Sequence, residues 1–149
     1  MRSLKVVVLC SLVMLFSACT CKTRSSSIGD ADNVPVAGDG GPLTDIHFAF
    51  DKSDLSPASR QTLQENAGWL KENGAATVTV EGHCDERGTD EYNLALGQRR
   101  AQAAYDYLRG LGIAADRMGT VSYGEAQPLD PRSTEDAWAK NRRAHFRVN

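Results

Sequence analysis

The sequence lacks several features that mark common functional classes. It has 17 Lys and Arg against 19 Asp and Glu, a formal net charge of -2, so it has no broad basic field of the kind that binds nucleic acid. It has no G-x-S-x-G nucleophile elbow to support Ser/His/Asp catalysis. At 149 residues, with 41% hydrophobic and 24% charged, it is too short for a large multidomain enzyme and close to the average for one globular domain with short extensions.

No apolar run is long enough to cross a bilayer, which takes about 20 residues. Residues 6–16 form a mostly apolar run of 11 residues, preceded by Arg2 and Lys5. This order of a basic start and a short apolar run is typical of a secretory signal peptide. We therefore expect a signal peptide over residues 1–18 and export of the remainder.

The signal peptide ends in Leu15-Phe16-Ser17-Ala18-Cys19, which resembles the lipobox of bacterial lipoproteins. The resemblance implies cleavage before Cys19, followed by acylation of Cys19 with fatty chains such as palmitate, which anchor a protein durably. Thr20 stands where an Asp retains lipoproteins in the inner membrane, so the resemblance implies the outer membrane, with the domain in the periplasm. A freely secreted protein cut elsewhere is the alternative.

Cysteine is scarce as well, at four residues. Cys10 leaves with the signal peptide and Cys19 is acylated, so Cys21 and Cys84 remain and cannot build a disulfide framework. We expect Cys84 to be a small buried residue rather than a nucleophile, whereas Cys21 is either modified or free.

The remaining chain divides into a tether and one domain. Residues 19–42 comprise the lipidated N-terminus and a segment rich in Ser, Gly and Asp with no sustained hydrophobic period, which predicts a flexible tether. Residues 43–149 are long enough to close a single hydrophobic core. Alternating strand and helix patterns there predict an α+β domain.

Hydrophobic periodicity places the elements of this domain. We expect strands over residues 44–50, 77–82, 118–123 and 143–148, and helices over 57–74, 91–111 and 135–141. The first strand should turn Ile46, Phe48 and Phe50 to one side. The long helix should bury a stripe that begins with Leu94 and continues through Gly97.

Three segments carry a resemblance to a known family. They are HFAFDKSDLSP at residues 47–57, GHCDERGTDEYN at 82–93 and AWAKNRRAHFRVN at 137–149. Together they resemble the OmpA-like C-terminal domains, over essentially the whole domain. The resemblance implies a β-α-β-α-β-β two-layer sandwich with a mixed four-stranded sheet, and a groove that holds the diaminopimelate of peptidoglycan stem peptides.

The same resemblance implies the ligand residues. Asp85 and Arg100 match the pair that grips the ligand, and Leu96 matches a wall of its pocket. Phe50 and Asp51 match positions whose backbone lines the pocket, although the pattern alone makes Phe50 a core residue and Asp51 a turn residue.

Chemical reasoning agrees with this pair, because an amino acid head needs a carboxylate for its ammonium and a guanidinium for its carboxylate. On a helical wheel Asn93, Leu96 and Arg100 share one side, and Arg99 points to solvent. Asn93 is either a ligand contact or a brace between loop and helix. The structural alternative is that Asp85 braces its loop and Arg100 merely pairs with it.

Other sites have weaker support. His83, Cys84 and Asp85 alternate in direction along a strand and cannot converge on one ion, so we predict no metal and no cofactor. His47 and His145 lack a third ligand.

We therefore expect a nonenzymatic outer-membrane lipoprotein that binds peptidoglycan. The resemblance also implies a role in the Tol-Pal system, in cell division and envelope integrity, with TolB as a periplasmic partner. A lipoprotein that contacts only periplasmic proteins and a cell-wall hydrolase are the alternatives.

Overall fold

The computed structural model describes residues 41–149 of the chain. The predicted signal peptide, Cys19 and nearly all of the predicted tether lie outside the described residues. The elements in chain order are β1 (Ile46–His47), α1 (Pro57–Glu72), β2 (Val78–His83), α2 (Asp90–Gly110), the 3-10 turn η1 (Ala115–Arg117), β3 (Met118–Gly124), α3 (Glu135–Asn141) and β4 (Arg143–Val148).

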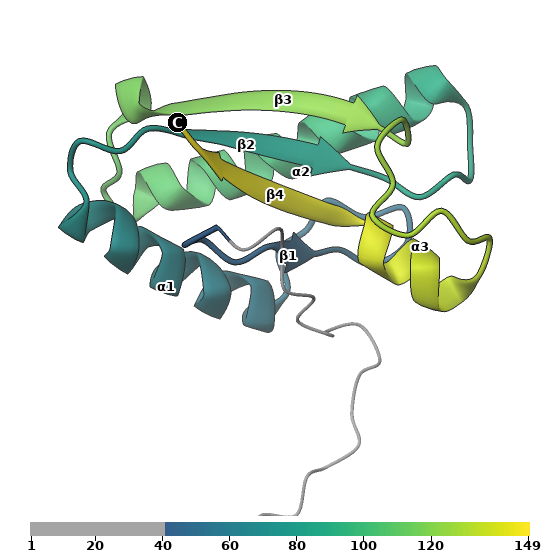
Figure 1. Cartoon of the computed structure of the whole chain (residues 1–149), viewed down its shortest axis with the longest axis horizontal. Coiled ribbons are helices and arrows are strands. Elements are labelled where there is room, and N and C mark those ends of the chain that lie inside the picture. Colours follow the sequence, from purple (N-terminus) through teal and green to yellow (C-terminus); the bar gives the residue numbers. More distant parts are fainter. Residues whose placement is uncertain (1–40) are drawn as a thin grey trace, which may run out of the picture.

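Four strands form one mixed sheet in the order β1-β4-β2-β3 (Figure 1). The central strand β2 pairs with β3 in parallel and with β4 antiparallel, and the short β1 pairs antiparallel with β4. α2 packs against β2 and β3, and α1 packs against α2 and β1. The predicted α+β two-layer sandwich with a mixed four-stranded sheet is confirmed.

The core lies between the helices and one face of the sheet. Side chains alternate along a strand, so Val78 and Val80 of β2 and Phe146 of β4 point to that face and are almost fully buried. Leu63 of α1 and Leu108 of α2 cover them with no exposed surface. None of the helices in the described part of the chain is long and apolar enough to cross a membrane.

Local signals set the starts of both long helices. The side chain of Ser56 accepts a hydrogen bond from the Ser59 backbone, and Pro57 occupies the first turn of α1. Thr89 caps α2 in the same way, by accepting from the Tyr92 backbone at 3.2 Å.

Two predictions about the elements are wrong. The first strand ends after His47 rather than running to residue 50, because the chain turns away from the sheet, with a hydrogen bond from Lys52 N to Ala49 O and a positive φ of 56° at Asp51. Phe50 is therefore 54% exposed instead of buried beside Phe48.

The buried stripe of α2 also differs from the prediction. Leu94 is 52% exposed, and its neighbour Asn93 takes the inward position with 1% exposure. The polar amide is satisfied there by loop carbonyls, so hydrophobicity alone placed the start of the stripe one residue too late, whereas Gly97, Ala101 and Leu108 are buried as predicted.

Candidate functional site

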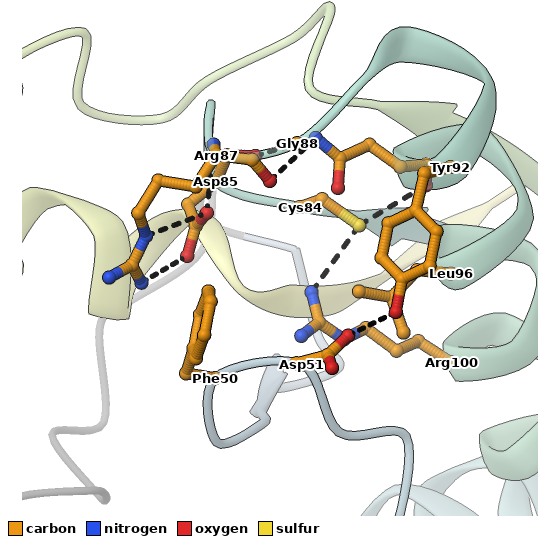
Figure 2. Close-up of a pocket in the computed structure, with 10 residues that line it drawn as sticks. Phe50, Asp51, Cys84, Asp85, Arg87, Gly88, Tyr92, Leu96 and Arg100 are labelled. Carbon is orange, nitrogen blue, oxygen red and sulfur yellow. Dashed lines mark hydrogen bonds and ion pairs between the residues drawn. The ribbon is translucent and has the colours of Figure 1, made fainter.

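A pocket of about 220 Å³ opens where the turn after β1, the loop after β2 and the first turns of α2 meet. Its lining residues come from all three segments (Figure 2): Phe50, Asp51, Cys84, Asp85, Arg87, Gly88, Tyr92, Asn93, Leu96 and Arg100. Every residue predicted for the ligand site therefore lies at this one pocket.

The inner wall depends on a close approach of α2 to β2. A Cβ atom at Gly82 would lie 1.9 Å from the carbonyl oxygen of Gly97, and one at Gly97 would lie 2.3 Å from the hydroxyl of Ser122. Only glycine fits at these contacts. The approach carries Leu96 and Arg100 toward the end of β2, and it leaves Arg99 on the solvent side of the helix, as predicted.

Arg100 is 1% exposed and is held in place by backbone carbonyls. Its Nε donates to Lys52 O at 2.9 Å, one terminal nitrogen donates to His83 O at 2.8 Å, and the other donates to Ala49 O at 3.2 Å. A further contact to Cys84 Sγ at 3.4 Å uses a fourth of the five guanidinium N–H groups. Burial lowers the pKa of Arg100, but an arginine remains cationic at neutral pH, so this pocket-lining residue keeps a full charge and one N–H that its recorded hydrogen bonds do not use.

Asp85 is 4% exposed and forms a fork with Arg87 two residues later. Asp85 Oδ1 accepts from the backbone N and the Nε of Arg87, and Oδ2 accepts from a terminal nitrogen of Arg87 at 2.7 Å. Arg142, at the start of β4, donates to the same Oδ2 at 3.3 Å. Burial raises the pKa of Asp85, but hydrogen bonds from Arg87 and Arg142 outweigh that effect and hold the pKa below its usual range.

The simple alternative for Asp85 and Arg100 is therefore wrong in part. Asp85 does brace its loop, but its hydrogen bonds go to Arg87 and Arg142, whereas those of Arg100 go to carbonyls and Cys84. The two charges belong to separate networks that meet at the same pocket.

Arg87 is a site residue that the sequence reasoning missed. Its guanidinium lies 4.0 Å from the ring centroid of Phe50 and 4.2 Å from that of Trp138. It also lies 3.5 Å from Glu135 on α3. The spacing of Asp85 and Arg87 in a polar loop could have indicated the fork, but nothing local indicates the aromatic partners.

Asn93 makes the contacts of a brace. Its side-chain nitrogen donates to the carbonyls of Asp85 and Arg87, each at 3.2 Å, and to the carboxylate of Glu125. The backbone carbonyl of Asn93 accepts a hydrogen bond from Cys84 Sγ at 3.2 Å. Cys84 is 2% exposed and burial raises the pKa of its thiol, so it is a small buried residue, as predicted.

The outer rim is formed by Phe50, Asp51 and Tyr92. The Tyr92 hydroxyl donates to Asp51, which links the start of α2 to the turn after β1 across the pocket mouth. The hydrogen bond to Asp51 raises the pKa of Tyr92, so this hydroxyl remains a donor at neutral pH.

Chemically, the pocket is lined by the carboxylate of Asp85 and the guanidinium of Arg100. Leu96 and the rings of Phe50 and Tyr92 add apolar surface to its lining. Such a surface fits a small ligand that carries an ammonium and a carboxylate close together. Within residues 41–149 no three His, Cys, Asp or Glu side chains group closely enough to hold a metal ion.

Comparisons with known proteins give similarity over most of the described domain. The model of the OmpA family matches residues 47–142. A peptidoglycan-associated lipoprotein from Haemophilus influenzae is 52% identical over 99 residues, which are 66% of this chain and 65% of that protein. The chain thus matches a little less than two thirds of that relative's length.

A second relative aligns over more of the chain. The peptidoglycan-associated lipoprotein of Pasteurella multocida is 39% identical over 141 residues, which are 94% of each chain. Among solved structures, the peptidoglycan-associated lipoprotein from Burkholderia pseudomallei superposes with a TM-score of 0.68 at 38% identity, covering 70% of this chain and 89% of that one.

Proposed function

The chain belongs to the OmpA family and, within it, to the peptidoglycan-associated lipoproteins, and from this premise we propose that its pocket binds the diaminopimelate of peptidoglycan stem peptides. One end of diaminopimelate is an amino acid head with an ammonium beside a carboxylate. The observation that carries the proposal is that Asp85 and Arg100 both line one pocket, each from a different element.

Each half of the head has a partner. The carboxylate of Asp85 is held ionised by its arginines, so it carries the negative charge that attracts an ammonium. Arg100 offers its remaining N–H and its charge to a carboxylate from a rigid, buried position. Leu96 and Phe50 provide apolar walls for the methylenes between the two ends of the ligand.

The proposal includes the anchor and the setting. Acyl chains on Cys19 would hold the protein in the outer membrane, and the tether of residues 19–42 would let the domain reach the peptidoglycan. The link is noncovalent and involves no reaction. We place the protein in the Tol-Pal system, where TolB would be its periplasmic partner and where the link would serve envelope integrity and cell division.

Sedimentation with purified sacculi tests the pocket. Wild-type domain should cosediment, and Asp85→Ala and Arg100→Ala should each lose about 2–5 kcal/mol of binding free energy, which is roughly 30-fold or more, since each leaves one charge of the ligand unpaired. Asp85→Asn keeps the shape of the side chain and serves if the alanine variant unfolds. Arg99→Ala, which removes an exposed arginine from the same helix, is the matched control.

Two outcomes would contradict the proposal. Unchanged cosedimentation of the Asp85 and Arg100 variants would exclude this pocket as the binding site. Absence of cosedimentation by the wild type would favour a lipoprotein that contacts only proteins. Soluble fragments released from the sacculi would favour the hydrolase. Sacculi with amidated diaminopimelate should bind less well, because amidation removes a carboxylate.

A further inference from the structure

The carboxylate of Asp85 has no free acceptor position. A carboxylate offers about four lone-pair positions. Asp85 Oδ1 accepts from the Arg87 backbone at 3.1 Å and from Arg87 Nε at 3.2 Å, and Oδ2 accepts from Arg87 at 2.7 Å and from Arg142 at 3.3 Å. A ligand ammonium can therefore bind this carboxylate only if one of these donors leaves.

The two arginines differ in how readily they can leave. The side chain of Arg142 is 4% exposed and also donates to Phe48 O at 3.1 Å, so it is fixed from two sides. The side chain of Arg87 is 31% exposed and donates to no backbone carbonyl among its recorded hydrogen bonds. Arg87 is the donor that can move.

Arg87 also has other partners that could hold its guanidinium once it leaves Asp85. The central carbon of its guanidinium lies 4.0 Å from the ring centroid of Phe50 and 4.2 Å from that of Trp138, so it contacts both rings (Figure 2 shows Phe50 beside the fork). Arg87 already donates to Glu135 Oε2 at 3.5 Å, and Glu135, whose side chain is 62% exposed, also pairs with Arg142 at 3.0 Å through Oε1. A guanidinium that turns against the two rings can therefore give up Asp85 and keep Glu135 without leaving its aromatic contacts.

We propose that Arg87 is a specificity-determining residue that occupies the ammonium position of the empty pocket, and that a ligand binds only when its own ammonium replaces this guanidinium on Asp85. The inference rests on the proposed function. It explains why the pocket should reject ligands that have a carboxylate but no ammonium, because such ligands leave the fork between Asp85 and Arg87 closed.

The test is a titration of the domain with meso-diaminopimelate, followed by calorimetry and by the NMR signal of Arg87 Nε–H. In the wild type, ligand should shift this signal and speed its exchange with water as the bond to Asp85 breaks. Arg87→Gln removes the competitor and should bind roughly three- to tenfold more tightly, as expected for the loss of one partly exposed charged hydrogen-bonded pair. Diaminopimelate acetylated on both amines should neither bind nor move the signal.

The chain supplies a matched control in Asp130 and Arg132, which form the same fork outside the pocket. Arg132→Gln should leave affinity unchanged. If wild type binds while the Arg87 signal stays still, or if Arg87→Gln binds no more tightly, the competition is overturned and the proposed function stands. If neither wild type nor Arg87→Gln binds diaminopimelate, the proposed function falls, and the competition falls with it.

Discussion

Within residues 41–149 the chain builds one small motif twice, and only one of these two copies lies at the pocket. In Asp85 and Arg87, and again in Asp130 and Arg132, an arginine two residues after an aspartate donates its backbone N, its Nε and a terminal nitrogen to that carboxylate. The terminal contacts measure 2.7 Å and 2.6 Å. The local chemistry of the two forks is the same, so the difference in role comes from their surroundings.

The two forks differ in how deeply their side chains are buried and in which second cation lies beside each aspartate. The side chains of Asp85 and Arg87 are 5% and 31% exposed, against 13% and 65% for Asp130 and Arg132. Asp85 has the buried Arg142 as its second cation, whereas the second cation of Asp130 is a lysine, 3.5 Å away and 36% exposed. An aspartate-arginine fork becomes a candidate binding element when tertiary packing places it in a pocket.

The largest contrast should come from removing each aspartate. Asp85→Ala leaves the buried guanidinium of Arg142 without this carboxylate and should lower the free energy of unfolding by about 3 kcal/mol. Asp130→Ala removes an ion pair whose arginine is 65% exposed and should have a much smaller effect. Urea unfolding of both variants measures the difference, and equal losses would mean that burial does not separate the forks.

A second contrast comes from disturbing the contact between β2 and α2, which supports the pocket that contains the fork of Asp85 and Arg87. Gly82→Ala places a Cβ 1.9 Å from the carbonyl oxygen of Gly97, so β2 and α2 must separate, at a cost of about 1–3 kcal/mol in stability and with weaker binding at the pocket. Gly68→Ala, in the middle of α1 with nothing within 4 Å, should instead stabilise by about 0.5–1 kcal/mol. Thermal unfolding of the two variants checks both signs.

The pH dependence should separate the forks more finely. The folded-state pKa of Asp85 is lowered, so below about pH 4 the unfolded chain takes up the proton first. The stability from Asp85 is therefore complete at neutral pH and is lost as pH falls through the lowered pKa. The gap in unfolding free energy between wild type and Asp85→Asn should shrink between pH 5 and pH 2, and a constant gap would contradict this account.

The same experiment applies to Asp130, whose pKa is lowered chiefly by hydrogen bonds from Arg132. The gap between wild type and Asp130→Asn should shrink in the same direction from a smaller starting value, because this fork lies nearer to solvent. A larger gap for Asp130→Asn than for Asp85→Asn at pH 7 would reverse the comparison.

The smallest effect concerns the contact of Arg87 with aromatic rings. Among the described contacts, Arg132 has no such contact. Trp138→Phe keeps a ring beside Arg87, whereas Trp138→Leu supplies an apolar side chain somewhat smaller than phenylalanine and without a ring. The two variants should differ in unfolding free energy by about 0.5–1 kcal/mol, the size of an exposed cation–π contact. Chemical denaturation resolves such a difference, and identical curves would assign Trp138 a packing role alone.

Most of the fold could be predicted from the sequence because its signals are local. Ser56 before Pro57 predicts the start of α1, and alternation predicts β4 at the residues where it lies. The end of β1 could not be predicted, because the turn that follows it is held by Arg100, which is 48 residues from Lys52.

The site residues also divide into those that sequence motifs predict and those that depend on contacts far apart in the chain. The family motifs brought Asp85 and Arg100 to one pocket, and the family model and relatives confirm the resemblance that predicted them. Arg142 was missed, because it reaches Asp85 across 57 residues and its own neighbourhood is simply a basic doublet at the start of a strand. A long-range ion pair leaves no periodic trace in a sequence.

Arg100 has one more consequence. Its guanidinium ties the carbonyls of Ala49 and Lys52 to that of His83, so the floor of the pocket is made from three stretches that meet only in the finished domain. A fragment that lacks any one of these stretches cannot form this floor. Binding of the proposed ligand would therefore report that folding is complete, and a bound ligand would in turn raise the melting temperature by mass action.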